Sequence, residues 1–301
     1  MTWRRGLAVV AVVAVAVAGY ALAGESEQGS SRGKSRLSIV ATDAGPYDVS
    51  LRAPAEVDAG LVEIELRNRG ATPHDAQLIR VEGSQTATDV VRMLEAPDPD
   101  PKPRWMRTAG GVAPVAPGET ATVTQVLQPG TYYAADTQEP TLPSGGNLVG
   151  AASGGIARIE VRGDDGGAEL PATAATIVAR EYGFDSNGIS AGANRVTFRN
   201  AGRERHQVVA FRVADGVPFR VGARAVERRR RDTGWVPVDV PSERATTVLD
   251  GGGEQVTELT FAPGSYLLLC FVNDRAGGYP QWTYGMRGRL DVPSTTGDPG
   301  R

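Results

Sequence analysis

Hydrophobic residues in this chain mostly alternate with polar ones, in short runs that Gly and Pro interrupt. Residues 62–66 (Val-Glu-Ile-Glu-Leu) and 195–198 (Arg-Val-Thr-Phe) are examples. A period of two residues puts successive side chains on opposite faces of a strand. Short strands separated by turns are typical of antiparallel β-sandwiches. The pattern therefore predicts an all-β fold.

The predicted strands fall into two groups of five. They cover residues 62–66, 76–81, 121–126, 132–135 and 156–161, and then 195–198, 207–213, 255–261, 266–272 and 287–292. A helix is expected at residues 88–94, with a counterpart near 221–229, each in the longer middle connection of its group.

A block of sequence near residue 59 recurs near residue 191. Asn68 and His74 in RNRGATPH match Asn200 and His206 in RNAGRERH. Farther on, LQPGTYY matches FAPGSYL and GGIARIEV matches GMRGRLDV, in the same order and at a nearly constant offset. Solenoid repeats have much shorter periods. We therefore predict one unit that is duplicated in tandem.

The repeat and the composition of the connecting segments give a domain organisation. We predict a signal peptide or uncleaved anchor at 1–23, a flexible linker at 24–36, a first domain at 37–162, a linker at 163–172, a second domain at 173–293 and a tail at 294–301. These two domains are the first and second units below.

The first residues predict export from the cytoplasm. Arg4 and Arg5 precede an apolar run at 7–18, and small residues follow at 21–23. This order is typical of a secretory signal peptide. Export by the general or by the twin-arginine route both stay open, as does an uncleaved helix that would provide the only membrane contact. We expect an extracytoplasmic protein, secreted, periplasmic or on the cell surface.

Charge and cysteine content narrow the classes of function. The 32 basic residues are spread along the chain and the formal net charge is −3, which does not favour nucleic acid as a partner. One cysteine excludes an internal disulfide. Cys270 is therefore a buried strand residue, a metal ligand or a reactive thiol.

The order of motifs in the second unit resembles the cupredoxin family, the blue copper proteins of the plastocyanin and azurin type. The unit has a lone His after a strand that ends Asn-x-Gly, then PGSYLLLC, then a Met after a short loop, and a last strand. The resemblance covers residues 38–161 and 173–292, so that both units would be cupredoxin-like domains. It implies Greek-key β-sandwiches in which a copper ion is held by two His, a Cys and a weak axial Met, a donor set suited to electron transfer.

Carried over residue by residue, the resemblance gives an incomplete copper site. It makes His206, Cys270 and Met286 the candidate copper ligands, and puts Gln281 where the family has its second His. The first unit keeps His74, but Asp136 stands at the Cys position and Gly155 at the Met position. Because the chain has only two histidines, neither unit has two imidazoles.

We therefore expect a non-enzymatic binding or interaction protein whose copper site is lost or incomplete. No cofactor is expected, although copper is possible, and the partner is an unknown protein or small ligand. The alternative is a copper carrier or electron-transfer protein that uses the site of the second unit. Oxidase activity of the multicopper type needs several His-rich motifs, which two histidines do not supply.

Overall fold

The computed structural model describes residues 34–45, 48–96, 100–138, 149–228 and 238–294. The predicted signal peptide or anchor, nearly all of the 24–36 linker and the tail beyond Ser294 lie outside the described residues. No helix within the described ranges is long and apolar enough to cross a membrane. The predictions of export and localisation stay predictions.

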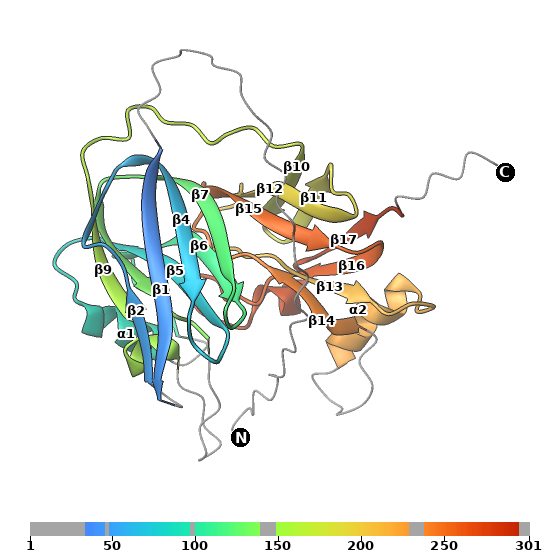
Figure 1. The fold of residues 1–301 in the computed structure, drawn as a ribbon. Coiled ribbons are helices and arrows are strands. Elements are labelled where there is room, and N and C mark those ends of the chain that lie inside the picture. The colour runs from blue at the N-terminus through green and yellow to red at the C-terminus, as the bar shows by residue number, and fades with distance from the viewer. Residues whose placement is uncertain (1–33, 46–47, 97–99, 139–148, 229–237, 295–301) are drawn as a thin grey trace, which may run out of the picture.

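Strands form most of the structure (Figure 1). They are β1 (Ser35–Gly45), β2 (Asp48–Arg52), β3 (Glu56–Asp58), β4 (Gly60–Asn68), β5 (His74–Val81), β6 (Met106–Val115), β7 (Thr120–Leu127), β8 (Gly130–Ala135), β9 (Ile156–Arg162), β10 (Ala175–Arg180), β11 (Gly183–Asn187), β12 (Gly192–Asn200), β13 (Val209–Val213), β14 (Val238–Ala245), β15 (Glu254–Phe261), β16 (Gly264–Leu269) and β17 (Arg287–Val292). The helices are α1 (Ala87–Glu95) and α2 (Phe219–Arg228), with 3-10 turns η1 (Gly150–Ser153) and η2 (Gln281–Tyr284).

The strands form two sheets. In the first unit, a five-stranded sheet in the order β3-β9-β8-β5-β6 packs against β2-β1-β4-β7. The latter four strands continue into the second unit as one ladder, in the order β15-β12-β10-β11-β17-β16-β13-β14. This ladder folds back on itself where Gly183 of β11 pairs with Arg287 of β17.

Each unit has its own hydrophobic core, and the alternation in the sequence builds it. Val62, Ile64 and Leu66 of β4 point into the first core, whereas Val196 and Phe198 of β12 point into the second. Of the polar residues between them, Glu63 and Thr197 are half-exposed on the opposite face. Glu65 lies on that face too but is buried, because Arg36 and Arg67 bond its carboxylate. The all-β sandwich class that the pattern predicts is confirmed.

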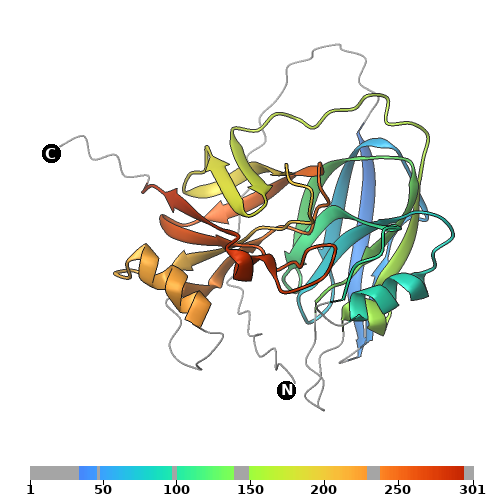
Figure 2. The ribbon, with the colours of Figure 1, turned by 180° about the vertical axis from the view of Figure 1, so that it is seen from behind.

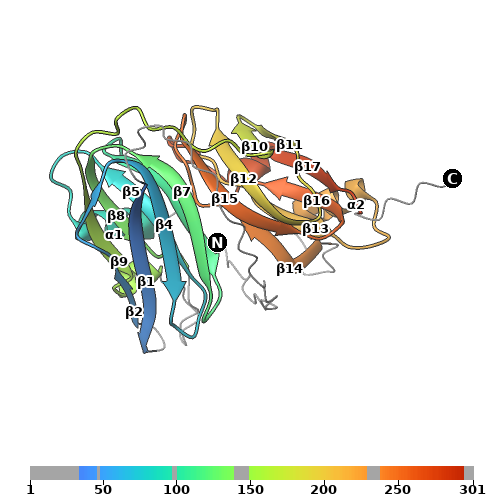
Figure 3. The same cartoon turned by 45° about the horizontal axis from the view of Figure 1, so that its top comes forward.

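The two units meet side by side through β7 and β15 (Figures 1 and 3). Within the units, Gly60 of β4 pairs with Leu127 of β7, and the equivalent Gly192 and Phe261 pair in the same way. In this register Thr257 is the equivalent of Val123, and these two residues pair with each other. A residue that pairs with its own equivalent lies on a local two-fold axis. The edge strands β7 and β15 are therefore related by a local two-fold axis at this pair.

Side chains from one unit also bond the backbone of the other. The amide of Gln77 donates to the Val248 carbonyl across 3.0 Å and accepts from its N–H across 2.8 Å. Nearby, the N–H of Gly110 donates to the same carbonyl across 3.0 Å. At Gly110 φ is +75°, and a Cβ there would collide with the amides of Gln125 in the first unit and Gln255 in the second. The close contact between the units therefore requires glycine at this position.

Both expected helices are present, and they lie on opposite sides of the molecule when it is viewed from behind (Figure 2). The strand expected at 207–213 begins at Val209, and the one expected at 266–272 ends at Leu269. Cys270 thus lies just after the strand, because its carbonyl accepts from the N–H of Trp282 instead of extending the ladder. The strands β1, β2, β3, β6, β10, β11 and β14 were not predicted.

Candidate functional site

The structure brings the four candidate ligand residues of the second unit together at one end of the sandwich. All of them are buried. The main chain holds them in place, because Trp282 bonds the carbonyl of Cys270 and the N–H of Met286 donates to the carbonyl of Gln281 across 3.1 Å. Cys270 and Met286 also belong to the same hydrophobic core.

The side chain of Gln281 forms a hydrogen bond with one ring nitrogen of His206. Its Oε1 lies 2.7 Å from Nδ1 of His206. The Nε2 of Gln281 donates to the Arg205 carbonyl across 3.2 Å and to Oδ1 of Asp274 across 2.8 Å. These two bonds fix the amide so that its oxygen faces the imidazole. Nδ1 of His206 therefore carries the hydrogen and has no lone pair free for a metal.

The other ring nitrogen of His206 faces a carboxylate. Nε2 lies 3.4 Å from Oε1 of Glu181 and has no hydrogen-bond partner among the described residues. Glu181 in turn accepts from the backbone N–H groups of Arg203 and Glu204. Although burial raises the pKa of Glu181, these N–H bonds outweigh it and hold the pKa below its usual value. The carboxylate thus stays charged and fixes the loop before His206.

The thiol of Cys270 is in a poor state for binding a metal. Burial raises its pKa to about 11. Because the thiolate is the form that binds metals, a neutral thiol among Leu268, Leu290 and Phe198 behaves as a small apolar side chain.

The first unit repeats this arrangement with different residues. Nδ1 of His74 lies 2.6 Å from Oδ2 of Asp136, and Nε2 lies 3.0 Å from Oδ1 of Asp43. Asp43 also accepts from the loop N–H groups of Ala71 and Thr72.

Gly150 leaves room for Asp136 to bond Nδ1 of His74, as Gln281 bonds Nδ1 of His206 in the second unit. It begins η1, as Gln281 begins the equivalent turn η2. A Cβ at Gly150 would lie 2.6 Å from Oδ2 of Asp136. Asp136 therefore fills the space that the side chain of Gln281 occupies in the second unit.

These residues do not fit a copper ion as they stand. One nitrogen of His206 is bonded to Gln281, the thiol of Cys270 is held neutral, and no second imidazole is within the second unit. Among the described residues no group of three or more His, Cys, Asp or Glu side chains is arranged to hold a metal. The copper role of His206, Cys270 and Met286 stays a prediction.

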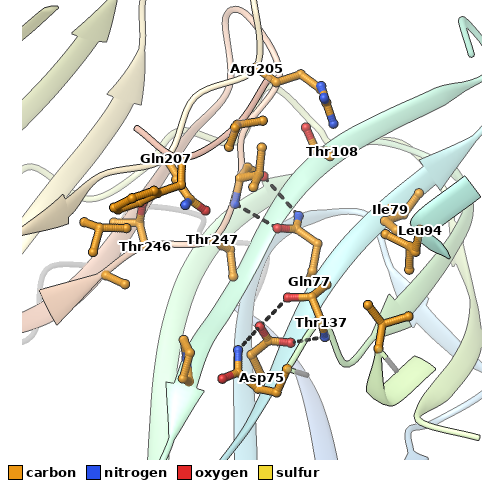
Figure 4. A pocket seen from close by; sticks show the side chains of 18 of the residues that line it. Asp75, Gln77, Ile79, Leu94, Thr108, Thr137, Arg205, Gln207, Thr246 and Thr247 are labelled. Atoms are coloured by element: carbon orange, nitrogen blue, oxygen red, sulfur yellow. Dashed lines mark hydrogen bonds between the residues drawn. The ribbon is translucent and has the colours of Figure 1, made fainter. Parts of the chain in front are cut away.

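A pocket that the sequence did not predict lies between the two units (Figure 4). Its volume is about 360 Å³, and residues of both units line it. Asp75 and Gln77 come from the first unit, and Arg205 and Gln207 from the second. Asp75 and Gln207 directly follow the two histidines, and this adjacency is the sequence signal that could have indicated the pocket.

Asp75 is a buried carboxyl on one side of this pocket. It accepts from the N–H and Oγ1 of Thr137 at 2.7 and 2.6 Å, and from Nε2 of Gln138 at 2.9 Å. Burial and then the nearby charge of Asp136 raise the pKa of Asp75 to about 7. The group therefore changes charge near neutral pH.

Comparisons with known proteins find structural neighbours. No family model and no curated protein matches the chain. It is similar to reduced auracyanin from the photosynthetic bacterium Roseiflexus castenholzii, with 26% identity over 40% of this chain and 95% of that chain and a TM-score of 0.25. Auracyanin B gives 27% identity over 42% and 92%, with a TM-score of 0.25. A multicopper oxidase gives 18% identity over 85% and 88%, with a TM-score of 0.24. These similarities do not assign the chain to a family.

Proposed function

We propose that the chain is a non-enzymatic, extracytoplasmic binding protein made of two tandem cupredoxin-like sandwiches. In each sandwich, hydrogen bonds between side chains take the place of a copper ion. Export is inferred from the first residues of the sequence, and the tandem organisation from the nearly constant offset between the matching motifs. The equivalent strand registers of the two units support that organisation.

The observation that carries the proposal is the contact between His206 and Gln281. The amide oxygen of Gln281 bonds Nδ1 of His206 across 2.7 Å, and the amide nitrogen donates two further hydrogen bonds that fix its orientation. Copper would have to break this buried pair and also remove a proton from Cys270. Leaving a buried polar group unpaired costs about 1–3 kcal/mol, and deprotonating a thiol of pKa about 11 at neutral pH adds to this.

Metal content and visible absorption of the purified chain test the proposal. The protein is incubated with Cu(I) and, separately, with Cu(II), and Cys270→Ser is treated in parallel. We expect neither stoichiometric copper nor the strong visible band of a copper–thiolate bond. One equivalent of copper that is lost in Cys270→Ser would overturn the proposal in favour of a copper carrier or electron-transfer protein.

A further inference from the structure

The pocket between the two units contains a buried positive charge without an ionic partner. Arg205 is only 5% exposed. Its Nη2 donates to the Asn273 carbonyl across 3.1 Å, but its Nε has no hydrogen-bond partner among the described residues. Within the same part of the chain Arg205 forms no ion pair. The nearest acids, Asp250 and Glu204, attract it from a greater distance, and both bond Arg275. A buried guanidinium without a direct ion pair is unfavourable, and an anion in the pocket would compensate it. Burial and then the charge of Arg275 lower the pKa of Arg205, although Asp250 and Glu204 act against this.

A second unpaired group lies beside this arginine. Arg205 and Thr108 lie on the same side of the pocket, whereas Asp75 and Thr137 lie on the opposite side (Figure 4). Oγ1 of Thr108 is buried and has no hydrogen-bond partner among the described residues. The cation and the hydroxyl are both donors, and together they present a place for a carboxylate.

The lining also offers charge of the opposite sign. Glu243, near the end of β14, lines the pocket. Among the described residues no side chain donates a hydrogen bond to its carboxylate, and Nη1 of Arg244 donates only to its backbone carbonyl. Burial raises its pKa, as expected for a carboxylate that lacks a cationic partner. Asp75 is a second buried acid in the same lining. These groups disfavour a second anionic group on the ligand and favour an ammonium group.

The size and apolar walls of the pocket fit a small organic molecule. About 360 Å³ is within the range of ligand sites. Apolar side chains from both units complete the lining, namely those of Ile79, Met93, Leu94, Met106, Val209 and Phe271.

We propose that this pocket binds a small organic zwitterion of the amino-acid type. The carboxylate lies against Arg205 and Thr108, and the ammonium group faces Glu243 and Asp75. This inference rests on the proposed function as a binding protein and names its ligand class and site.

The test is thermal unfolding of the full chain with each of the twenty amino acids in turn, at about 10 mM so that weak ligands also register. A ligand that binds only the native state raises the Tm in a concentration-dependent way. We expect at least one amino acid to raise the Tm by about 3 °C or more. Its deaminated acid, its decarboxylated amine and inorganic phosphate are measured in parallel, and none should match it.

Substitutions locate the site. Arg205→Met replaces the buried cation with an apolar chain of similar length, so we expect the unliganded Tm to be kept or raised and the ligand-induced shift to disappear. Glu243→Gln should reduce the shift. Arg195→Gln changes an exposed arginine of β12 and should leave the shift unchanged. Thr108→Val removes the unpaired hydroxyl with little change in shape and should weaken binding about threefold or more. This variant tests the site if Arg205→Met does not fold.

Three outcomes would overturn the inference. They are no shift with any amino acid, an equal shift in Arg205→Met, or a shift by the deaminated acid or by phosphate as large as that of the amino acid. Copper uptake is measured by metal content and does not enter these results, so failure of this inference and failure of the proposed function are distinguishable.

Discussion

Gln281 bonds Nδ1 of His206 across 2.7 Å, at the position where the cupredoxin resemblance places a second imidazole. The first unit reaches the same result by another route, because Asp136 bonds Nδ1 of His74 across 2.6 Å from the position of the cysteine. Two different side chains thus bond the equivalent buried nitrogen in the two units. A histidine that is held in this way in both units acts as a structural link between the loop after an early strand and the loop after a late one.

Replacing Gln281 with His tests whether the second unit binds copper once a second imidazole is present. The variant supplies the second imidazole beside His206, Cys270 and Met286, which are already buried together. We expect it to take up about one copper per chain and to show strong visible absorption, because two imidazoles and a thiolate form a favourable donor set for copper. Metal analysis and a visible spectrum measure both.

The double variant Gln281→His with Cys270→Ser is the control and should lose the absorption. A folded single variant that stays colourless with Cu(II) would mean that the four side chains do not converge on one metal position.

The thiol of Cys270 should be inert in the native protein. It is fully buried and burial raises its pKa to about 11, so thiolate and access are both lacking. We expect an aromatic disulfide reagent at about pH 8 to label the native chain at least a hundredfold more slowly than the chain in denaturant. Release of the coloured thiol measures the rate. Equally fast labelling in both states would place the thiol at the surface.

Stability should fall as the pH rises from about 4 to about 7 because of Asp75. Its pKa is raised to about 7 in the native state, by burial first and then by Asp136, and is about 3.9 in the unfolded chain. The native state therefore binds a proton that the unfolded state releases in this window, and the free energy of unfolding decreases by up to about 4 kcal/mol. Urea unfolding at several pH values gives the slope.

Asp75→Asn should remove most of this slope, whereas Asp58→Asn, at an exposed position, should keep it. A smaller slope of the same sign remains from Glu243, whose pKa burial also raises. Above about pH 6.5 a further loss remains in Asp75→Asn, and it comes from His74. Burial lowers the pKa of His74, but Asp136 and Asp43 outweigh it and raise the pKa overall. The stabilisation by His74 is thus present below the unfolded pKa and is lost as the pH rises through the folded one. A slope from pH 5 to 6 that is as steep in Asp75→Asn as in the unsubstituted chain would contradict the assignment.

Local pattern was enough to predict the class of fold. The alternation of Val62, Ile64 and Leu66 identifies β4 because each apolar residue lies in the core. β6 was missed because Gly110 and Gly111 read as a turn, although here their positive φ angles of 75° and 117° let the strand bulge and approach the second unit. The need for Gly110 comes partly from Gln255 and Leu249 of the second unit, far away in the sequence. Gly111 is needed because the backbone of Ala76 in the neighbouring strand lies against it.

The candidate site was predicted only in part, because the local sequence does not show which distant segments the fold brings together. The order of the motifs identified His206 and Gln281 as candidate site residues, and in the structure their side chains form a hydrogen bond. It did not reveal Asp43 or Glu181, because the ends of β1 and β10 are brought to the histidines only by parallel pairing with β4 and β12. The pocket lies at the junction of two units, and the position of Arg205 within it depends on how the units pack.

The last prediction concerns that junction. Gln77→Ala removes an amide that bonds Val248 through both its oxygen and its nitrogen and also donates to the Gly110 carbonyl across 2.9 Å. Because Val248 and Gly110 lose buried partners, we expect the free energy of unfolding to fall by about 2–4 kcal/mol. Urea unfolding measures the change, and Gln128→Ala, at an exposed position within the first unit, should change it by less than about 0.5 kcal/mol. An equally small effect of Gln77→Ala would mean that the two sandwiches are held together by the β7–β15 pairing and not by this amide.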